Sequence, residues 1–411
     1  MISSMMNPLA RFSLVAFRGN GAITSLSAVK ISKRNFSDKN EIEVSLTSDN
    51  PLTATLKRGT GGRSSFNGNV VTVFGATCPL GKVLVSNLTR RGTQVIIPYR
   101  GDPMEVRELK VSGDLGQVMF VPFSLRDEES LFRAVKYSNV VVNLIGTYSD
   151  TPSFTFNDTN VDGARRIAKV SRLAGVKKLV HMSALNARPD PEPVCSKLGA
   201  QFFKTKYEGE LAVRNEFPDA IVFRPGWMFG IADRLFNYYT ASARRTFTKS
   251  IALWGLGQDI YKEPVYFIDV VQGMVNSIFN EFNYGETYEC VGPRRYELKD
   301  MVRYFNDWLN MGEKDYKYVF DLKYSPITRA VITVQTLTLK KPFVCWGLVE
   351  IEHTTDKLTP GAKTLVDLGV DLTNLESKAK YVLYPARIGG WYDKPLHQIV
   401  EPLPPRYQPT Y

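Results

Sequence analysis

The stretch that decides the fold spans residues 70–81 and reads Val70-Val71-Thr72-Val73-Phe74-Gly75-Ala76-Thr77-Cys78-Pro79-Leu80-Gly81. Its first five residues form a short apolar, β-branched run, which is typical of a strand buried on both faces of a parallel sheet. A glycine-containing turn follows, and then a helix with leucine and valine on one face begins. Such a turn brings backbone N–H groups and the positive end of a helix dipole to a phosphate. The stretch therefore predicts a dinucleotide-binding unit.

The alternation of strands and helices continues along the chain. We expect further strands at residues 94–99, 118–122, 139–145, 177–182 and 220–223, with helices at 128–136, 158–174 and 199–215. This alternation predicts an α/β fold with a doubly wound parallel sheet, a Rossmann domain over residues 68–225. Beyond Arg224-Pro225 the pattern becomes irregular. There we expect a smaller C-terminal α/β region, residues 226–411, partly interleaved with the Rossmann domain and ending in an extended tail around Pro402–Pro405.

One segment of the C-terminal region carries apolar residues at helical spacing. The residues on this face are Ile327, Ala330, Val331, Val334 and Leu337, and Lys340-Lys341 closes the segment. We favour an ordinary helix that packs into the core. A partner-facing or membrane-surface helix is the alternative.

The charge of the chain is concentrated at its beginning. The 411 residues carry a formal net charge of +11, and five bases but no acids lie in the first 37 residues, which are also rich in serine. This composition predicts a mitochondrial transit peptide over residues 1–36. Its removal subtracts five charges and leaves +6, too diffuse for a nucleic-acid partner. Residues 37–67, which end in glycines and serines, are expected to form an extended N-terminal arm.

Composition also limits the classes of protein to consider. The chain has 44% hydrophobic and 23% charged residues, which excludes disordered, collagenous and coiled-coil proteins. No apolar stretch reaches about 18 residues, so we expect no spanning helix. The four cysteines contain no C-x-x-C pair, and the three histidines lack metal-ligand spacing. We therefore expect no metal site and a reducing compartment.

The turn after the first strand resembles the G-x-x-G-x-x-G turn of the short-chain dehydrogenase/reductase superfamily, especially its extended branch. Cys78 stands where the middle glycine belongs, which puts the closest approach of backbone to phosphate in doubt. The resemblance implies a cofactor-binding role for the other residues of this turn: Gly75, Ala76, Thr77, Leu80 and Gly81.

The end of the second expected strand bears on the choice of nucleotide. Arg100 lies 19 residues beyond Gly81, where an NAD-selective site usually carries an acidic residue for the ribose 2′-hydroxyl. A guanidinium there would pair with a 2′-phosphate, so we favour NADPH. Asp102 follows two residues later, and a merely solvent-exposed Arg100 is the alternative.

Further motifs extend the resemblance over about residues 68–290. They are Asn143-Leu144-Ile145-Gly146, Val180-His181-Met182-Ser183, Arg224-Pro225-Gly226-Trp227-Met228-Phe229-Gly230 and the segment Pro264–Val271. The resemblance implies that Leu144 and Gly146 support the adenosine ribose, that Ser183 occupies the substrate-polarising serine position, and that Pro225 packs near the nicotinamide. Ser124 stands where an adenine-contacting aspartate is common.

The proton donor of the superfamily is missing. Active members place a tyrosine four residues before a lysine, but here Phe202 precedes Lys206. Phenylalanine cannot transfer a proton, a step that typically contributes about 10²–10⁴-fold. Tyr207 lies about 100° around the helix from Lys206. We therefore expect no catalytic residue, with Lys206 holding the cofactor ribose. An active NADP-dependent mitochondrial reductase or epimerase with another donor is the alternative.

Several segments together resemble a narrower family, the dinucleotide-binding accessory subunits of mitochondrial NADH:ubiquinone oxidoreductase, respiratory complex I. The segments are the transit peptide, the Gly-Gly-Arg-Ser-Ser arm, and residues 73–77, 95–100, 113–117, 138–146 and 288–295. The resemblance implies an atypical reductase fold, peripheral on the matrix side of the inner membrane, that holds NADPH for structure and assembly. It also implies other complex I subunits as partners, with inner-membrane lipid as a further contact and no small-molecule substrate.

Overall fold

The computed structural model describes residues 66–151, 153–231, 235–241, 251–309, 319–339, 342–384, 386 and 401–410. The transit peptide predicted at 1–36 lies outside the described residues, as does the arm predicted at 37–67 except for its last two residues.

An eight-stranded sheet forms the centre of the fold. Its strand order is β14-β11-β6-β5-β4-β1-β2-β3, and every pairing is parallel. The strands are β1 (Val70–Phe74), β2 (Gln94–Tyr99), β3 (Val118–Pro122), β4 (Val140–Asn143), β5 (Lys178–Met182), β6 (Ile221–Pro225), β11 (Thr287–Cys290) and β14 (Lys363–Thr364). Because the order reverses between β1 and β4, the sheet is doubly wound. The predicted fold class is confirmed.

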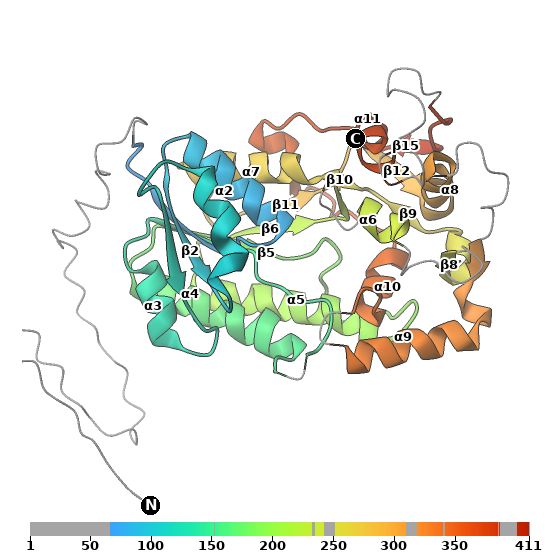
Figure 1. Cartoon of the computed structure of the whole chain (residues 1–411), viewed down its shortest axis with the longest axis horizontal. Coiled ribbons are helices and arrows are strands. Elements are labelled where there is room, and N and C mark those ends of the chain that lie inside the picture. The colour runs from blue at the N-terminus through green and yellow to red at the C-terminus, as the bar shows by residue number, and fades with distance from the viewer. Residues whose placement is uncertain are drawn as a thin grey trace, which may run out of the picture. The chain divides into compact units, whose positions relative to one another are not determined.

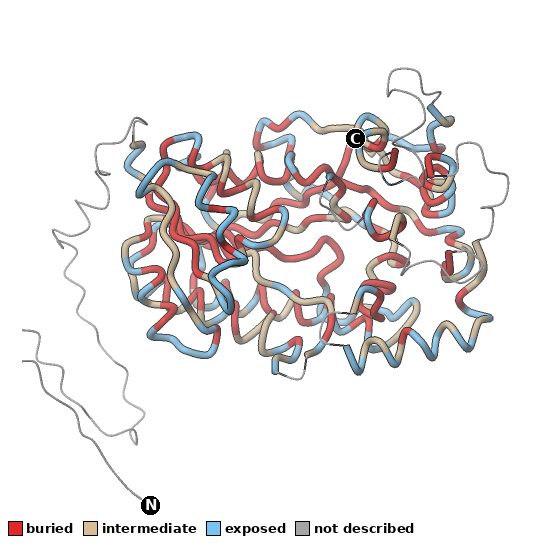
Figure 2. The backbone as a smooth tube through the Cα atoms, in the orientation of Figure 1, coloured by how far each residue is buried: buried red, intermediate tan, exposed pale blue. Residues whose placement is uncertain are grey.

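Helices cover both faces of this sheet (Figure 1). On one face α2 (Pro79–Arg90) packs against α7 (Phe267–Phe279), and on the other α3 (Glu128–Val135), α4 (Gly163–Leu173) and α5 (Lys197–Glu216) lie side by side. A single π-helical turn, Asn157–Asp162, precedes α4 where one continuous helix was expected. The six inner strands are buried almost throughout, while the edge strands β3 and β14 are partly exposed (Figure 2).

Residues beyond 225 supply two strands of the central sheet, β11 and β14, and the helix α7, which covers one face of the sheet. They also form smaller elements of their own. The helices are α6 (Leu235–Thr240), α8 (Leu298–Leu309), α9 (Pro326–Thr338), α10 (Trp346–His353) and α11 (Leu375–Leu383). The short strands pair as β7 (Met228–Phe229) with β10 (Val265–Tyr266), β8 (Ile251–Leu253) with β13 (Val319–Asp321), and β12 (Arg294–Glu297) with β9 (Tyr261–Lys262) and β15 (Tyr407–Pro409). The tail is therefore extended, and part of it pairs as a strand.

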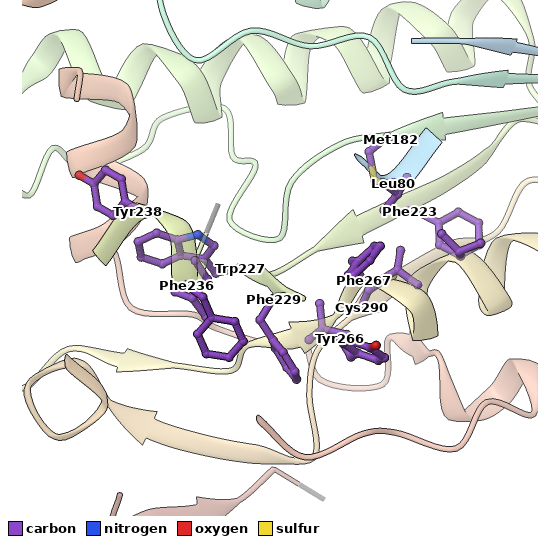
Figure 3. Close-up of a cluster of buried hydrophobic side chains, with 14 of the residues drawn as sticks. Leu80, Met182, Phe223, Trp227, Phe229, Phe236, Tyr238, Tyr266, Phe267 and Cys290 are labelled. Atoms are coloured by element: carbon purple, nitrogen blue, oxygen red, sulfur yellow. The ribbon is translucent and has the colours of Figure 1, made fainter. Parts of the chain in front are cut away.

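A cluster of aromatic side chains joins the central sheet to these smaller elements (Figure 3). The ring of Phe229 in β7 lies 5.8 Å from that of Phe236 in α6 and 5.4 Å from that of Tyr266 in β10. Phe236 in turn lies 5.3 Å from Phe305 of α8, with the ring edge toward the face. These separations are favourable for aromatic pairs. The cluster fixes the C-terminal region against the sheet edge where the strands end.

The helix α9 differs from our expectation. Its apolar residues were predicted to pack in the core, yet Ile327, Val331, Val334 and Leu337 are exposed, and this prediction is wrong. The physical reason is that the threonine side of the helix faces the protein instead. None of the helices in the described part of the chain has the length and apolar character needed to cross a bilayer.

Candidate dinucleotide site

Two glycines shape the turn between β1 and α2. Gly75 has a φ of +79°, in the left-handed region that favours glycine. At Gly81 an added Cβ would lie 2.7 Å from the Cα of Ala76, so only glycine lets α2 begin this close to the turn. Ala76 is buried and Thr77 is exposed, while Leu80 is buried in the first turn of the helix. This geometry provides the close backbone approach that a pyrophosphate requires.

Cys78 acts as the N-cap of α2. Its φ of −72° is one that any residue adopts, and its Sγ accepts a hydrogen bond from the Gly81 backbone N–H at 3.2 Å. Burial raises the pKa of its thiol. The turn therefore keeps its shape without a glycine at this position. One N–H at the helix end, however, already has a partner within the chain.

Two guanidinium groups lie over one aromatic ring beyond the end of β2. The Cζ of Arg100 lies 5.1 Å from the ring centre of Phe154, and the Cζ of Arg126 lies 4.5 Å from the same centre. Arg126 also donates to the Ser153 carbonyl oxygen at 2.6 Å. The exposed Ser124 lies just before Arg126 and follows β3. Our sequence analysis missed Arg126 and Phe154, because they reach Arg100 from distant parts of the chain.

The segment after β4 lies beside the turn. The N–H of Leu144 donates to the Phe74 carbonyl oxygen at 3.0 Å, which holds the segment against the end of β1. A Cβ added at Gly146 would lie 2.7 Å from the Nζ of Lys206, so the missing side chain leaves room for the lysine. Leu144, Gly146 and Lys206 thus meet beside the glycine turn.

Three polar side chains are buried at the end of β5. Lys206 donates from its Nζ to the Met182 carbonyl oxygen at 3.2 Å, and burial lowers its pKa to about 8. Burial, together with the charge of Lys206, lowers the pKa of His181 to about 3. Neither the Nε2 of His181 nor the Oγ of Ser183 has a hydrogen-bond partner among the described residues. A buried hydroxyl of this kind fits a polar ligand group.

Phe202, which stands four residues before Lys206, is a buried and packed ring. It is 4% exposed and stacks on Tyr148, with the ring centres 5.2 Å apart and an interplanar angle of 17°. Phe203 and Ile351 belong to the same apolar cluster. Because Ile351 lies on α10, a helix of the C-terminal region covers this part of α5. The sequence carried no signal for Tyr148 or Ile351.

Pro225 ends β6, next to Ser183. The N–H of Ser183 donates to the Phe223 carbonyl oxygen at 2.8 Å, and that of Leu185 donates to the Pro225 carbonyl oxygen at 3.0 Å. Arg224 forms ion pairs with Glu210 of α5 at 2.7 Å and with Glu289 of β11 at 3.5 Å.

The structure thus brings the predicted residues to one edge of the sheet, because parallel strands end on the same side. They form three groups: the β1–α2 turn with Leu144 and Gly146, the ends of β5 and β6 with Ser183, Lys206 and Pro225, and the ends of β2 and β3 with Arg100 and Ser124. The first two groups meet through Lys206. The glycine turn and the unpaired Ser183 hydroxyl both fit a dinucleotide. Within the described ranges, no group of three or more potential metal ligands is found.

Comparison with known proteins agrees with this fold. A family model described as NAD(P)H-binding matches residues 75–251. A UDP-glucose 4-epimerase of Thermotoga maritima, solved with UDP-glucose, covers 76% of this chain and 97% of its own, with a TM-score of 0.52 and 16% identity. MoeE5, solved with UDP-glucose and NAD, has the same coverage, TM-score and identity. The likeness shows that the chain has a Rossmann-type α/β fold.

Relatives in sequence define the family more narrowly. NADH dehydrogenase (ubiquinone) 1 alpha subcomplex subunit 9, mitochondrial, of Rattus norvegicus is 38% identical over 84% of this chain and 88% of its own. The NADH-ubiquinone oxidoreductase 40 kDa subunit, mitochondrial, of Neurospora crassa is 35% identical over 85% and 88%. A ceramide reductase of Caulobacter vibrioides is 34% identical over 40% and 48%. The chain belongs to the family of the mitochondrial alpha subcomplex subunit 9 proteins.

Proposed function

We propose that this chain is a non-catalytic subunit of mitochondrial complex I that holds NADPH as a structural cofactor and supports assembly or stability of the complex. The observation that carries the proposal is Phe202, a buried phenylalanine in the position of the proton donor. Bound NADPH supplies a hydride, but reduction of a carbonyl also needs a proton. The packed ring of Phe202 cannot provide one.

The residues at the sheet edge suit retention of the nucleotide. Gly75 and Gly81 would hold the pyrophosphate at the start of α2, where the helix dipole favours negative charge. Lys206 would hold the nicotinamide ribose, and the Ser183 hydroxyl would gain a hydrogen-bond partner. Arg100, with Arg126 over the same ring, supports the choice of NADPH, because a 2′-phosphate is a strong acceptor for guanidinium.

The nucleotide would stabilise the folded chain directly. A ligand that binds only the native state stabilises it by about 4 kcal/mol at a thousandfold excess over its Kd. Because the candidate contacts come from β1, β4, β5 and α5, the bound molecule would link elements on both sides of the central strands. The surface that contacts other complex I subunits would be held in shape in the same way. We infer a peripheral position on the matrix side of the inner membrane.

A charge reversal at Arg100 tests the proposal. Arg100→Glu would face a 2′-phosphate with like charge, so we expect less assembled complex I on native gels of mitochondrial membranes. Arg133→Glu is the matched control, since Arg133 is also exposed but lies on α3. Equal amounts of complex with both variants, together with loss of bound NADPH in Arg100→Glu, would contradict the proposal.

A second candidate function is that of an active NADP-dependent reductase. The similarity to a ceramide reductase over part of the chain favours it. It needs a proton donor other than residue 202. Oxidation of NADPH by the isolated chain, measured with long-chain and sugar carbonyl compounds, distinguishes the two candidates. We expect no oxidation above the rate without protein.

A further inference from the structure

Residues 144–148, the segment after β4, border the candidate nucleotide site at one end. A Cβ added at Gly75 would lie 3.2 Å from the carbonyl carbon of Leu144, and one added at Gly146 would lie 2.7 Å from the Nζ of Lys206. The segment is therefore packed against both the glycine turn and the buried lysine. A nucleotide held by these two features borders the segment as well.

The other end of the same segment, Tyr148, supports α10. The Tyr148 carbonyl oxygen accepts a hydrogen bond from the Cys345 thiol at 3.4 Å, and a Cβ added at Gly347 would lie 2.3 Å from the same oxygen. The Tyr148 ring stacks on Phe202. Because the packing leaves no free space at this contact, α10 and Tyr148 can move only together.

A second connection between the site and α10 runs through α5. Lys206 and Phe202 both belong to α5, and Ile351 of α10 lies in the apolar cluster of Phe202. Glu350 of α10 accepts a hydrogen bond from the N–H of Ser196, the residue before α5, at 2.9 Å. Elements joined by packed contacts of this kind tend to open as one unit.

The helix α10 in turn holds α9, which lies beside it (Figure 1). The Oγ1 of Thr336 accepts a hydrogen bond from the Trp346 backbone N–H at 3.2 Å, and the Oγ1 of Thr333 accepts one from the Trp346 indole N–H at 3.0 Å. Of the 13 residues of α9, all of them described, only Ile332 is buried. The two bonds to Trp346 therefore make the position of α9 depend on that of α10.

We propose that a nucleotide bound at the candidate site orders α10 and, through Trp346, also α9, so that occupancy of the site regulates two helices of the C-terminal region. An opening of α10 that displaces Tyr148 or α5 also disrupts the site, and a bound ligand therefore opposes it. This inference rests on the proposed function for the identity of the nucleotide, NADPH. It adds which elements respond to the nucleotide.

Amide hydrogen exchange of the full-length chain, with and without saturating NADPH, tests the inference. We expect the amides of α10 and α9 to exchange at least about tenfold more slowly with NADPH, within the limit of about a thousandfold that linkage sets at a thousandfold excess over Kd. The helix α8 is the internal reference, because it belongs to the same region but packs on α6 and α11. Its exchange should not change. Fluorescence titration of the same sample measures NADPH binding itself.

Threonine variants test the connection between α10 and α9. Thr333, Thr336 and Thr338 each donate a hydroxyl hydrogen bond to a carbonyl oxygen within α9, but among the described residues only the first two also accept from Trp346. Valine keeps the branched shape and removes the oxygen. In the double variant Thr333→Val, Thr336→Val we expect NADPH to slow exchange in α10 but no longer in α9. Thr338→Val is the matched control and should respond like the wild type.

The outcomes separate this inference from the proposed function. NADPH that binds but leaves the exchange of α10 and α9 unchanged, or slows that of α8 equally, overturns the inference and leaves the proposed function intact. Equal responses of α9 in the double variant and in Thr338→Val also overturn it, because Trp346 would then not carry the effect. A wild type that binds no NADPH contradicts the proposed function and the inference with it. Slower exchange in a chain that never joins complex I contradicts the proposed function alone.

Discussion

The sulfur of Cys78 and the missing side chain of Gly81 serve the same helix end in different ways. The sulfur accepts a hydrogen bond from the Gly81 N–H, while Gly81 allows α2 to pack against Ala76. The doubt raised by Cys78 in the sequence is therefore limited to one N–H group. Sulfur is a weak acceptor, so a phosphate oxygen would compete well for that group.

Lys206 destabilises the folded chain when no nucleotide is bound. Its pKa of about 8 lies below the ordinary 10.5 because burial penalises the ammonium, although Glu210 acts in the other direction. The unfolded chain binds more protons between these two values, so the contribution of Lys206 to stability rises from pH 8 to pH 10.5. Below pH 8 the penalty is constant. Lys206 thus lowers the stability of the nucleotide-free chain at neutral pH.

A substitution measures this penalty. Lys206→Met should raise the free energy of unfolding without nucleotide on the order of 2 kcal/mol at pH 7. The gain should shrink above pH 8 and vanish near pH 10.5. Lys204→Met, at an exposed position of the same helix, should change little. Urea denaturation across this pH range checks the prediction, and a gain that grows with pH would refute it.

At the scale of elements, α10 is the helix that covers Phe202 on α5. A Cβ added at Gly199 of α5 would lie 2.5 Å from the Cβ of Glu350, and one added at Gly347 would lie 2.3 Å from the Tyr148 carbonyl oxygen. The two glycines let α10 pack tightly against α5 and against the segment after β4. As a result Ile351 reaches the Phe202 cluster. The packing explains how Phe202 is buried by the chain itself.

A single carboxylate attaches α10 to the beginning of α5. Glu350 is 1% exposed and accepts hydrogen bonds from the N–H groups of Val194, Cys195 and Ser196 at 2.5–2.9 Å. Glu350→Gln removes the charge from this contact, so we expect a loss of about 2 kcal/mol in the free energy of unfolding. The exposed Glu105→Gln serves as the control. Chemical denaturation that finds equal stability for the two variants would show that the contact contributes little.

At the scale of the whole molecule, local sequence patterns predicted where the strands lie. They did not predict which distant parts of the chain contact each other. The bounds of β1, β2 and β3 agree with those expected, because short apolar runs ended by turns are local signals. The pairing of β15 with β12 joins parts of the chain about a hundred residues apart and has no such signal. For α9, periodicity identified the apolar face correctly but contained no information about what that face contacts.

The residues of the candidate site also divide into those that the sequence predicted and those that only the structure revealed. The glycine turn and the Phe202–Lys206 spacing were predictable because each lies within one short segment. Arg126, Phe154 and Ile351 were not, since only the folded chain brings them to the sheet edge. The closing of the Phe202 position by α10 is likewise a property of the fold. It strengthens the proposal that the chain retains a nucleotide without using it.

The nucleotide content of purified complex I tests the central claim most directly. Nucleotides are extracted from the complex before and after sustained turnover with NADH and ubiquinone, and NADPH and NADP⁺ are quantified per complex. A structural cofactor predicts about one NADPH per complex that stays reduced throughout. A complex without NADPH, or NADPH that turns into NADP⁺ in step with turnover, would contradict it.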